Sequence, residues 1–277
     1  MIKICSIVVV LLITLGCDIK TVKPENTQIT AAAITPVNNN NFDTSYKTIH
    51  VLVALCDNKY QGIVPVPAAI GNGQDPNSNL YWGCVFGIRS YFKNSASWTL
   101  LKRYSIDSIK MERLIFKNKK QNYYLVADAY NGKYIKQCTV EFLQSCSGQA
   151  KDTLHINNKT IGINGNATLV AYIGHDGLMD FTLNQNFTNT DNIKREAIIL
   201  ACISKRYFAP HLAATKANPL VWSTGLMSPE AYTLHDALES YINNASAENI
   251  RSSAAKAYSK YQKCSVKAAR NLLVTGF

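Results

Sequence analysis

The chain has 277 residues, of which 47% are hydrophobic and 17% are charged, and its formal net charge at pH 7 is +11. This length and apolar content are enough for one domain, or two small ones, with a sizeable core, and they exclude a long disordered acidic or basic chain. The positive charge would suit a nucleic acid or an anionic surface, but a basic solvated exterior is the simpler interpretation. The only dense basic run, residues 117–120 (KNKK), fits a hairpin turn between two candidate strands. No stretch interleaves aromatic and basic residues, so we expect no nucleic-acid partner.

The N-terminus has the pattern of an export signal. Lys3 precedes an apolar stretch at residues 7–15 that is too short for a transmembrane helix. This stretch ends in Thr14-Leu15-Gly16-Cys17, which resembles the lipobox of bacterial lipoproteins. The resemblance implies a signal peptide over residues 1–16, acylation of Cys17, and a lipid-anchored protein of the cell envelope facing the periplasm or the exterior. The alternative is a buried strand that starts the fold.

The next segment, residues 18–46, is rich in Thr, Asn and Pro and fits a flexible tether. A single domain is then expected over residues 47–277. Cleavage would leave six cysteines, an even set that could pair in an oxidising compartment, although their connectivity stays open. Their spacing matches no zinc pattern. The six are Cys56, Cys84, Cys138, Cys146, Cys202 and Cys264.

Apolar strands alternate with helices along the rest of the chain. Strands are predicted at residues 49–57, 113–116, 123–127, 167–173, 197–201 and 220–222. Helices are predicted at residues 80–92, 133–145, 229–242 and 247–273, the third with Ser228 as its N-cap. Because the core strands are apolar throughout, the pattern predicts an α/β fold, a three-layer sandwich with a mostly parallel central sheet.

Polar residues follow the predicted strands, at the edge where ligands bind in such sheets. They are Asp57, Asp128, His175 with Asp176, Cys202, and Ser223 with Thr224. Polar residues must follow any buried strand, so ordinary loop chemistry is one interpretation. The other is that His175 and Cys202 end neighbouring strands and work together on one substrate atom.

Two short stretches carry a resemblance to a known family. Tyr172-Ile173-Gly174-His175-Asp176-Gly177 and Ile199-Leu200-Ala201-Cys202 are similar to the His and Cys motifs of the caspase-like (clan CD) cysteine peptidases, which include metacaspases, legumain and gingipains. The resemblance implies a caspase-like fold with Cys202 as the nucleophile and His175 as the acid/base. The backbone N–H groups of Asp176 and Gly177 would face the oxyanion. Residues 182–195 remain for the crossover between the two strands, and their Asn and Thr content is poor for a helix.

The acids at the strand ends suggest a substrate preference. Asp57, Asp128 and Asp176 would form an acidic mouth that favours a Lys or Arg side chain in the substrate, or a divalent cation. The Gly-, Pro- and Asn-rich segment 58–79 could cover this mouth. We therefore expect an envelope cysteine peptidase acting on a peptide or protein, with no cofactor and no metal site. Two alternatives stay open: a non-enzymatic envelope lipoprotein that acts as a binding or assembly module, and a receiver-like domain that binds metal or phosphate through the Asp cluster.

Overall fold

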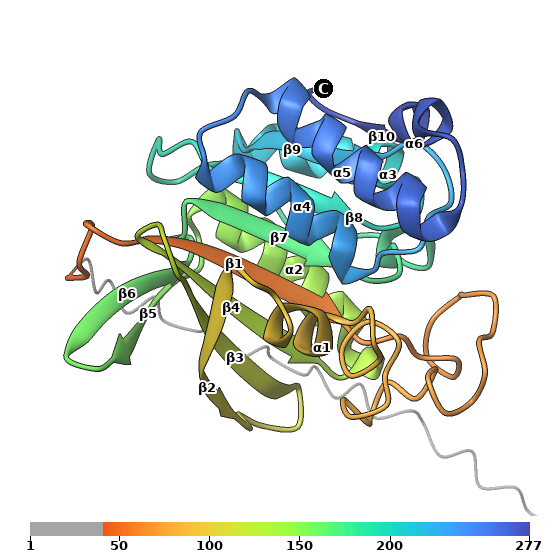
Figure 1. Ribbon diagram of the computed structural model, residues 1–277, viewed down its shortest axis with the longest axis horizontal. Coiled ribbons are helices and arrows are strands. Elements are labelled where there is room, and N and C mark those ends of the chain that lie inside the picture. The colour runs from red at the N-terminus through yellow and green to blue at the C-terminus, as the bar shows by residue number, and fades with distance from the viewer. Residues whose placement is uncertain (1–40) are drawn as a thin grey trace, which may run out of the picture. The chain divides into compact units, whose positions relative to one another are not determined.

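The computed structural model describes residues 41–277, which belong to one compact unit. The predicted signal peptide, Cys17 and most of the tether lie outside the described residues. An eight-stranded sheet runs through the unit in the order β10-β9-β8-β7-β1-β4-β3-β2 (Figure 1). Its strands are β1 (Lys47–Ala54), β2 (Trp98–Tyr104), β3 (Lys110–Asn118), β4 (Tyr123–Tyr130), β7 (Leu169–Ile173), β8 (Glu196–Leu200), β9 (Asn218–Ser223) and β10 (Leu273–Val274).

The centre of the sheet is parallel and its margins are antiparallel. Strands β4, β1, β7, β8 and β9 pair in parallel, whereas β3, β2 and β10 pair antiparallel with their neighbours. Nearly every residue of the parallel strands is buried, as expected where both faces of a sheet are covered. The prediction of an α/β fold with a mostly parallel sheet is therefore confirmed.

Helices cover the two faces of the sheet separately. One core cluster joins Val51 and Ala171 to the helices α1 (Ile88–Lys93), α4 (Ala231–Ile242) and α5 (Ala247–Gln262). A second joins Leu52 and Tyr172, whose side chains point the other way, to α2 (Ile135–Ser147) and α3 (Ser204–Thr215). Figure 1 shows α4 and α5 in front of the sheet and α2 behind it. The hairpin of β5 (Lys151–Ile156) and β6 (Lys159–Asn164) packs through Ile161 and Ile163 against β3 and β4.

Three predicted helix boundaries are wrong, each for a local reason. The helix predicted at residues 80–92 is reduced to α1, because residues 80–86 form turns around the carbonyl oxygen of Asn79 and Gly87 is extended (φ −76°, ψ 159°), which interrupts any helix before Ile88. The helix predicted at 247–273 is two helices. Lys263 adopts a left-handed φ of 56° after α5, and Ser265 then caps α6 (Val266–Leu272) by accepting the N–H of Ala268. Helix α4 begins after Glu230, so Ser228 is not its N-cap.

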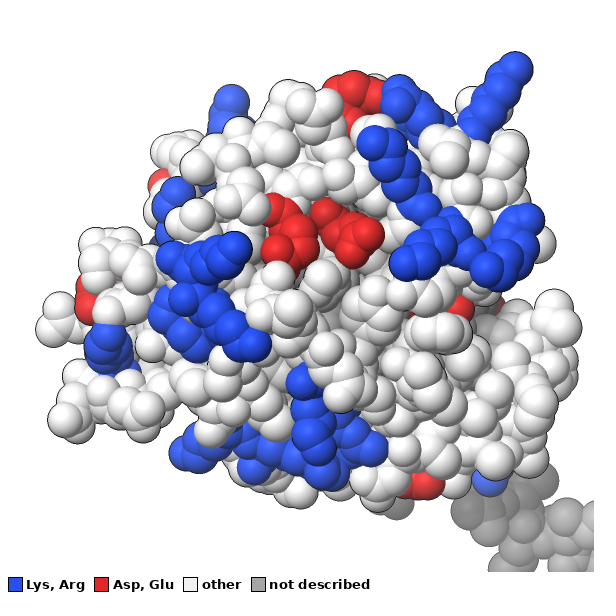
Figure 2. Space-filling model, in the orientation of Figure 1, with Lys and Arg blue, Asp and Glu red and all other residues white. Residues whose placement is uncertain are grey.

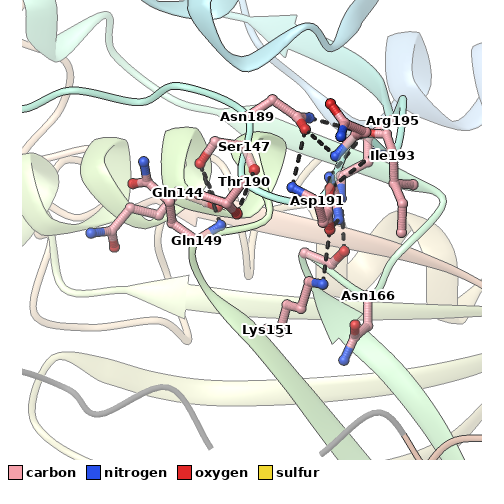
Figure 3. A network of polar contacts seen from close by, with 12 residues as sticks. Gln144, Ser147, Gln149, Lys151, Asn166, Asn189, Thr190, Asp191, Ile193 and Arg195 are labelled. Carbon is pink, nitrogen blue, oxygen red and sulfur yellow. Dashed lines mark hydrogen bonds and ion pairs between the residues drawn. The ribbon is translucent and has the colours of Figure 1, made fainter. Parts of the chain in front are cut away.

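The connection between β7 and β8 contains one short turn, η2 (Gly177–Met179), and is otherwise irregular up to Arg195. This agrees with the poor helix propensity expected for residues 182–195. Side chains hold the segment in place instead (Figure 3). Arg195 is 1% exposed and its guanidinium binds Asp191 and the carbonyl oxygen of Gly165, while Lys151 pairs with the same aspartate at 2.8 Å. The backbone of Thr190 bonds to Ser147 at the end of α2.

Candidate functional site

The carboxyl ends of the parallel strands form one edge of the sheet, and His175 and Cys202 follow two of them. Strands β7 and β8 are adjacent, and their last paired residues are Ile173 and Leu200. One more backbone hydrogen bond, from Gly174 N to the oxygen of Leu200 at 3.2 Å, extends the pairing. Each candidate residue comes two positions after the last pair. The structure therefore places both residues just beyond the ends of neighbouring strands, at the same edge of the sheet.

The His175 ring is fixed in orientation by its neighbours. The residue is 6% exposed, and its Nε2 atom lies 2.9 Å from Oδ2 of Asp180. A carboxylate accepts a hydrogen bond, so Nε2 carries the hydrogen and the lone pair of Nδ1 stays available. Nδ1 makes no hydrogen bond to residues 41–277. The hydroxyl of Tyr172 also donates to the backbone oxygen of His175 at 2.7 Å. This arrangement gives the tautomer that a base acting through Nδ1 requires.

Glycine is required at the position before His175. Gly174 has φ of +147°, in the region that only glycine occupies readily, and a Cβ atom there would lie 2.7 Å from the backbone oxygen of Ala54. A side chain at this position would push β7 away from β1. The glycine thus allows the chain to turn tightly out of the sheet and deliver the imidazole to its edge.

Asp180 is a site residue that sequence reasoning missed. It follows η2 and also accepts the backbone N–H of Gly62 at 2.9 Å, so it joins His175 to the segment after β1. The sequence shows only that an acidic residue stands five positions after the histidine. One short helical turn between them, η2, is enough to bring the two side chains into contact. A depression of about 450 Å³ lies beside this carboxylate. Its lining residues are Lys136, Leu178, Met179, Asp180, Phe181 and Thr182.

Cys202 is half-buried and its sulfur contacts the backbone of Met227, in the loop after β9. The Met227 N–H lies 3.4 Å from Sγ, and the Met227 oxygen lies 3.5 Å from it. Burial raises the pKa of the Cys202 thiol, the Met227 N–H lowers it, and the nearby charge of Asp176 raises it further. Within the described residues the thiol has no hydrogen bond to His175. The two groups therefore share one edge of the sheet without forming a resting ion pair.

Asp176 is a buried carboxyl with an unused oxygen. It is 0% exposed; Oδ1 accepts the N–H of Leu178, and Oδ2 has no partner among residues 41–277. Burial raises the pKa of Asp176 to about 7, with the charge of Asp180 acting in the same direction. In the described part of the chain, no hydrogen bond uses the backbone N–H groups of Asp176 and Gly177. Oδ2 of Asp176 and these two N–H groups are thus without hydrogen-bond partners in the described residues, and the side chain of Asp176 is buried.

The other two predicted acids are already occupied. Asp57 is 1% exposed, and its carboxylate accepts the N–H groups of Lys59 and Tyr60 and the amide of Gln74, so it organises the loop after β1. Asp128 does not end its strand. It lies within β4, 0% exposed, and binds Arg113 and His50. The carboxylates of Asp57 and Asp128 are therefore not free to contact a substrate, which leaves Asp176 and Asp180 as the acids close to His175 in the chain.

A further group of titratable side chains surrounds Cys202 on the α4 and α5 side. Burial raises the pKa of Tyr81, and the charges of Cys56, Cys202 and Glu230 raise it further. Glu230 accepts the hydroxyl of Tyr232 at 2.8 Å, and burial raises its pKa. Nothing in the sequence pattern pointed to these residues, because they come from loops and helix starts that meet only in the folded chain.

Across residues 41–277, no three His, Cys, Asp or Glu side chains are grouped so as to hold a metal ion, and the six cysteines there are free thiols. None of the helices in this part of the chain has the length and apolar character needed to cross a bilayer. Comparisons with protein-family models, with curated proteins and with solved structures gave no match to this chain.

Proposed function

We propose that this protein is a cell-envelope cysteine peptidase with a three-layer, caspase-like fold, in which Cys202 attacks a peptide carbonyl and His175 serves as acid and base. The observation that carries the proposal is the register of β7 and β8, because His175 and Cys202 each follow the last paired residue of these neighbouring strands by two positions. The placement of α4 and α5 on one face of the sheet and α2 and α3 on the other also fits a layered fold of this kind.

Proton transfer follows from the resting states of the two groups. Burial raises the pKa of Cys202, so the thiol is protonated at rest and His175 Nδ1 must accept its proton as the sulfur attacks. Asp180, bonded to Nε2, stabilises the imidazolium that forms. The imidazolium then gives its proton to the leaving amine, and water hydrolyses the thioester. The N–H groups of Asp176 and Gly177 would bind the oxyanion.

One side-chain movement is implied by this chemistry. The sulfur of Cys202 now contacts the Met227 backbone, so it must turn toward His175 when substrate binds. Rotation about χ1 is a small change that a half-buried side chain can make. A substrate strand lying along this edge would displace the Met227 contact, which would couple thiol release to binding.

The buried carboxyl of Asp176 supports a preference for substrates with a basic side chain. Its unpartnered Oδ2 offers an acceptor to a Lys or Arg side chain, and the approach of a cation lowers the pKa of a carboxyl that burial has raised. Matched peptide reporters that carry Arg, Lys or Asp at the cleaved position test this preference. Faster cleavage of the Asp reporter would contradict it.

The central experiment is labelling with a thiol-directed electrophilic peptide. Cys202→Ser should abolish labelling, and His175→Ala should lower its rate at least tenfold, since general base catalysis contributes about 10²–10⁴-fold. Cys84→Ser and Cys264→Ser are the matched controls, because both thiols are also half-buried and stand outside the proposed pair. Equal labelling of Cys84, Cys202 and Cys264 would contradict the peptidase proposal.

The second candidate is a non-enzymatic envelope module that binds a partner at the same edge. It is favoured by one observation, the absence of a hydrogen bond between His175 and Cys202 within the described residues. The two candidates differ in turnover: a binding module would leave all peptide reporters intact while retaining affinity for a partner.

Attachment to a membrane through acylated Cys17 is proposed on the sequence motif. Incorporation of radioactive palmitate into the full chain, and its loss in Cys17→Ser, would support the attachment. A chain that incorporates no label would contradict it.

A further inference from the structure

The edge of the sheet opposite the candidate site gathers lysines from three segments of the chain. The backbone N–H of Lys47, at the start of β1, donates to the oxygen of Asn122 in the β3–β4 turn at 2.9 Å. The backbone N–H of Asp43 donates to the oxygen of Thr160 in β6 at 2.8 Å. The β3–β4 turn and the β5–β6 hairpin therefore flank the start of β1 (Figure 1). We call this region the lysine edge. It consists of Lys47, Lys117, Lys119, Lys120 and Lys159. Of these, Lys117 and Lys159 lie over the ring of Tyr46, and Lys47 lies over the ring of Tyr123.

Two lysines of the lysine edge share one tyrosine ring, and the acid nearest to them, Asp43, acts on Lys159 only through its charge. Within residues 41–277 none of the five lysines forms a salt bridge. Lys159 Nζ lies 4.0 Å from the centre of the Tyr46 ring, and Lys117 Nζ lies 5.8 Å from the same ring. Burial and the charge of Lys159 both lower the pKa of Lys117. Asp43, the acid of this segment, accepts two hydrogen bonds from Ser45. Crowded, unpaired cations of this kind attract an extended anionic partner.

Other parts of the surface also carry groups of positive charge, including groups on the right and at the bottom of the face drawn in Figure 2. Figure 2 shows Lys and Arg side chains in separate groups over the face drawn, one of them on the left, the side on which Figure 1 places the beginning of β1. Basic residues in other parts of the molecule are often paired, as Arg113 is with Asp128 and Lys110 with Glu141. The lysine edge is thus distinguished by the lack of partners rather than by the number of its charges.

The course of the chain identifies the partner. The described residues begin at this edge, and the 26 residues from Cys17 to Phe42 span at most about 90 Å. A lipid anchored at Cys17 would therefore reach the lysine edge without the chain passing around the domain. Lysines on separate turns around a tyrosine form a surface suited to headgroups, since lysine stems and tyrosine rings sit well at a bilayer interface.

We propose that the lysine edge docks onto a membrane rich in anionic phospholipid, so that the edge carrying His175 and Cys202 faces away from the bilayer. The inference rests on the proposed lipid anchor for its biological setting, but the docking surface itself depends only on residues of the described domain. Docking would orient the domain, which a tether alone cannot do.

Vesicle sedimentation of the full chain with Cys17→Ser tests the docking surface without an acyl anchor. Vesicles of pure phosphatidylcholine measure the background binding. Vesicles that contain three parts in ten phosphatidylglycerol measure the additional binding that anionic lipid causes, which we call the increment. Each lysine at an anionic surface is worth about a fivefold change in binding, so replacing Lys47, Lys119 and Lys120 by Glu should reduce the increment by roughly 100-fold or more. All three are exposed, and none donates a side-chain hydrogen bond to the described residues.

The matched control replaces Lys256, Lys260 and Lys267 by Glu. These lysines are also exposed, lie on α5 and α6, and change the net charge equally. The control should keep most of the increment, and 0.5 M salt should remove it from every variant. The proposal is overturned if the control variant loses as much binding to anionic vesicles as the test variant, or if the unsubstituted lysine edge gives no additional binding to them. It is also overturned if the protein binds duplex DNA through these lysines but does not bind anionic vesicles. Gln replacements at the same three lysines, with circular dichroism, separate loss of docking from loss of fold. Palmitate labelling and electrophile labelling report separately on the anchor and on the peptidase.

Discussion

Replacing Asp128 by alanine should destabilise the domain by about 3–5 kcal/mol, the cost of breaking a buried ion pair at one partner. The Asp128 carboxylate is 0% exposed and receives Nε and Nη2 of Arg113, both at 2.6 Å, and Nε2 of His50 at 3.0 Å. Its removal leaves a guanidinium that is 8% exposed with no counter-ion. Because domains are stable by only about 5–15 kcal/mol, the loss would be a large part of the total.

Urea unfolding followed by tryptophan fluorescence measures this loss, since Trp82, Trp98 and Trp222 are all buried. Glu248→Ala, which removes the pairs of a half-exposed carboxylate with Arg251 and Arg270, serves as the control and should have a far smaller effect. Replacing Arg113 and Asp128 together by leucine should cost less than Asp128→Ala alone, because no unpaired charge remains. A change below about 1 kcal/mol for Asp128→Ala would refute the reasoning, since that is the range of ordinary surface pairs.

The same cluster should make stability depend on pH. Hydrogen bonds from Arg113 and His50 hold the pKa of Asp128 well below its usual range. A depressed pKa contributes stability above the unfolded value, about 3.9, and this contribution is lost as the pH falls below it. The wild-type free energy of unfolding should therefore fall between pH 5 and pH 3, and that of Asp128→Asn should fall less. Equal slopes for the two proteins would contradict this assignment.

The remaining predictions concern the site. Asp180→Asn should slow electrophile labelling of Cys202 by roughly 10-fold or more at unchanged fold, because the imidazolium loses its counter-ion; an unchanged rate would remove Asp180 from the mechanism. Asp176→Asn should raise the stability at pH 8 but not at pH 4. Burial raises the pKa of Asp176 to about 7, so between about pH 4 and pH 7 the carboxyl ionises in the unfolded chain but stays protonated in the folded one, and the wild type loses stability over this range. Urea unfolding at the two pH values would show this, and a loss of stability at pH 8 would contradict it. Gly174→Ala should cost about 1–3 kcal/mol in urea unfolding, given its φ of +147° and the closeness of the Ala54 oxygen; a melting temperature equal to the wild type would show that β7 and β1 can adjust.

The parallel strands were predictable because each is buried on both faces, and the sequence of such a strand is a continuous run of apolar residues. Elements with a mixed pattern were missed. Strand β2 has only one fully buried residue, and β5 is largely exposed, so neither shows such a run. Helix α3 contains Pro210 and has few buried residues, which weakens the helical pattern. In each case tertiary contacts, rather than local preference, decide the structure.

The site was predictable only as far as strand ends can reveal it. Placing His175 and Cys202 at the ends of neighbouring strands required no more than two apolar runs and their order. The contact of Met227 with the sulfur depends on the path of the loop after β9, which has no local signature. The pairing of Asp128 with Arg113 was not predictable, because the predicted strand ends at Phe116 and Tyr123 place Val126 opposite Arg113. In the structure the register differs by two residues, which brings Asp128 opposite Arg113.

The irregular connection between β7 and β8 has a consequence for how the sequence can change. A helix satisfies its own backbone, but this segment relies on Asn189, Asp191, Arg195 and Gln149, whose side chains bond to backbone groups or to one another. Phe187 from the same segment is 2% exposed in the core. Substitution here should therefore be tolerated as poorly as in a buried helix, although the composition is that of a linker. Since the segment leads directly into the strand that ends at Cys202, disturbing its anchors would also shift the sulfur.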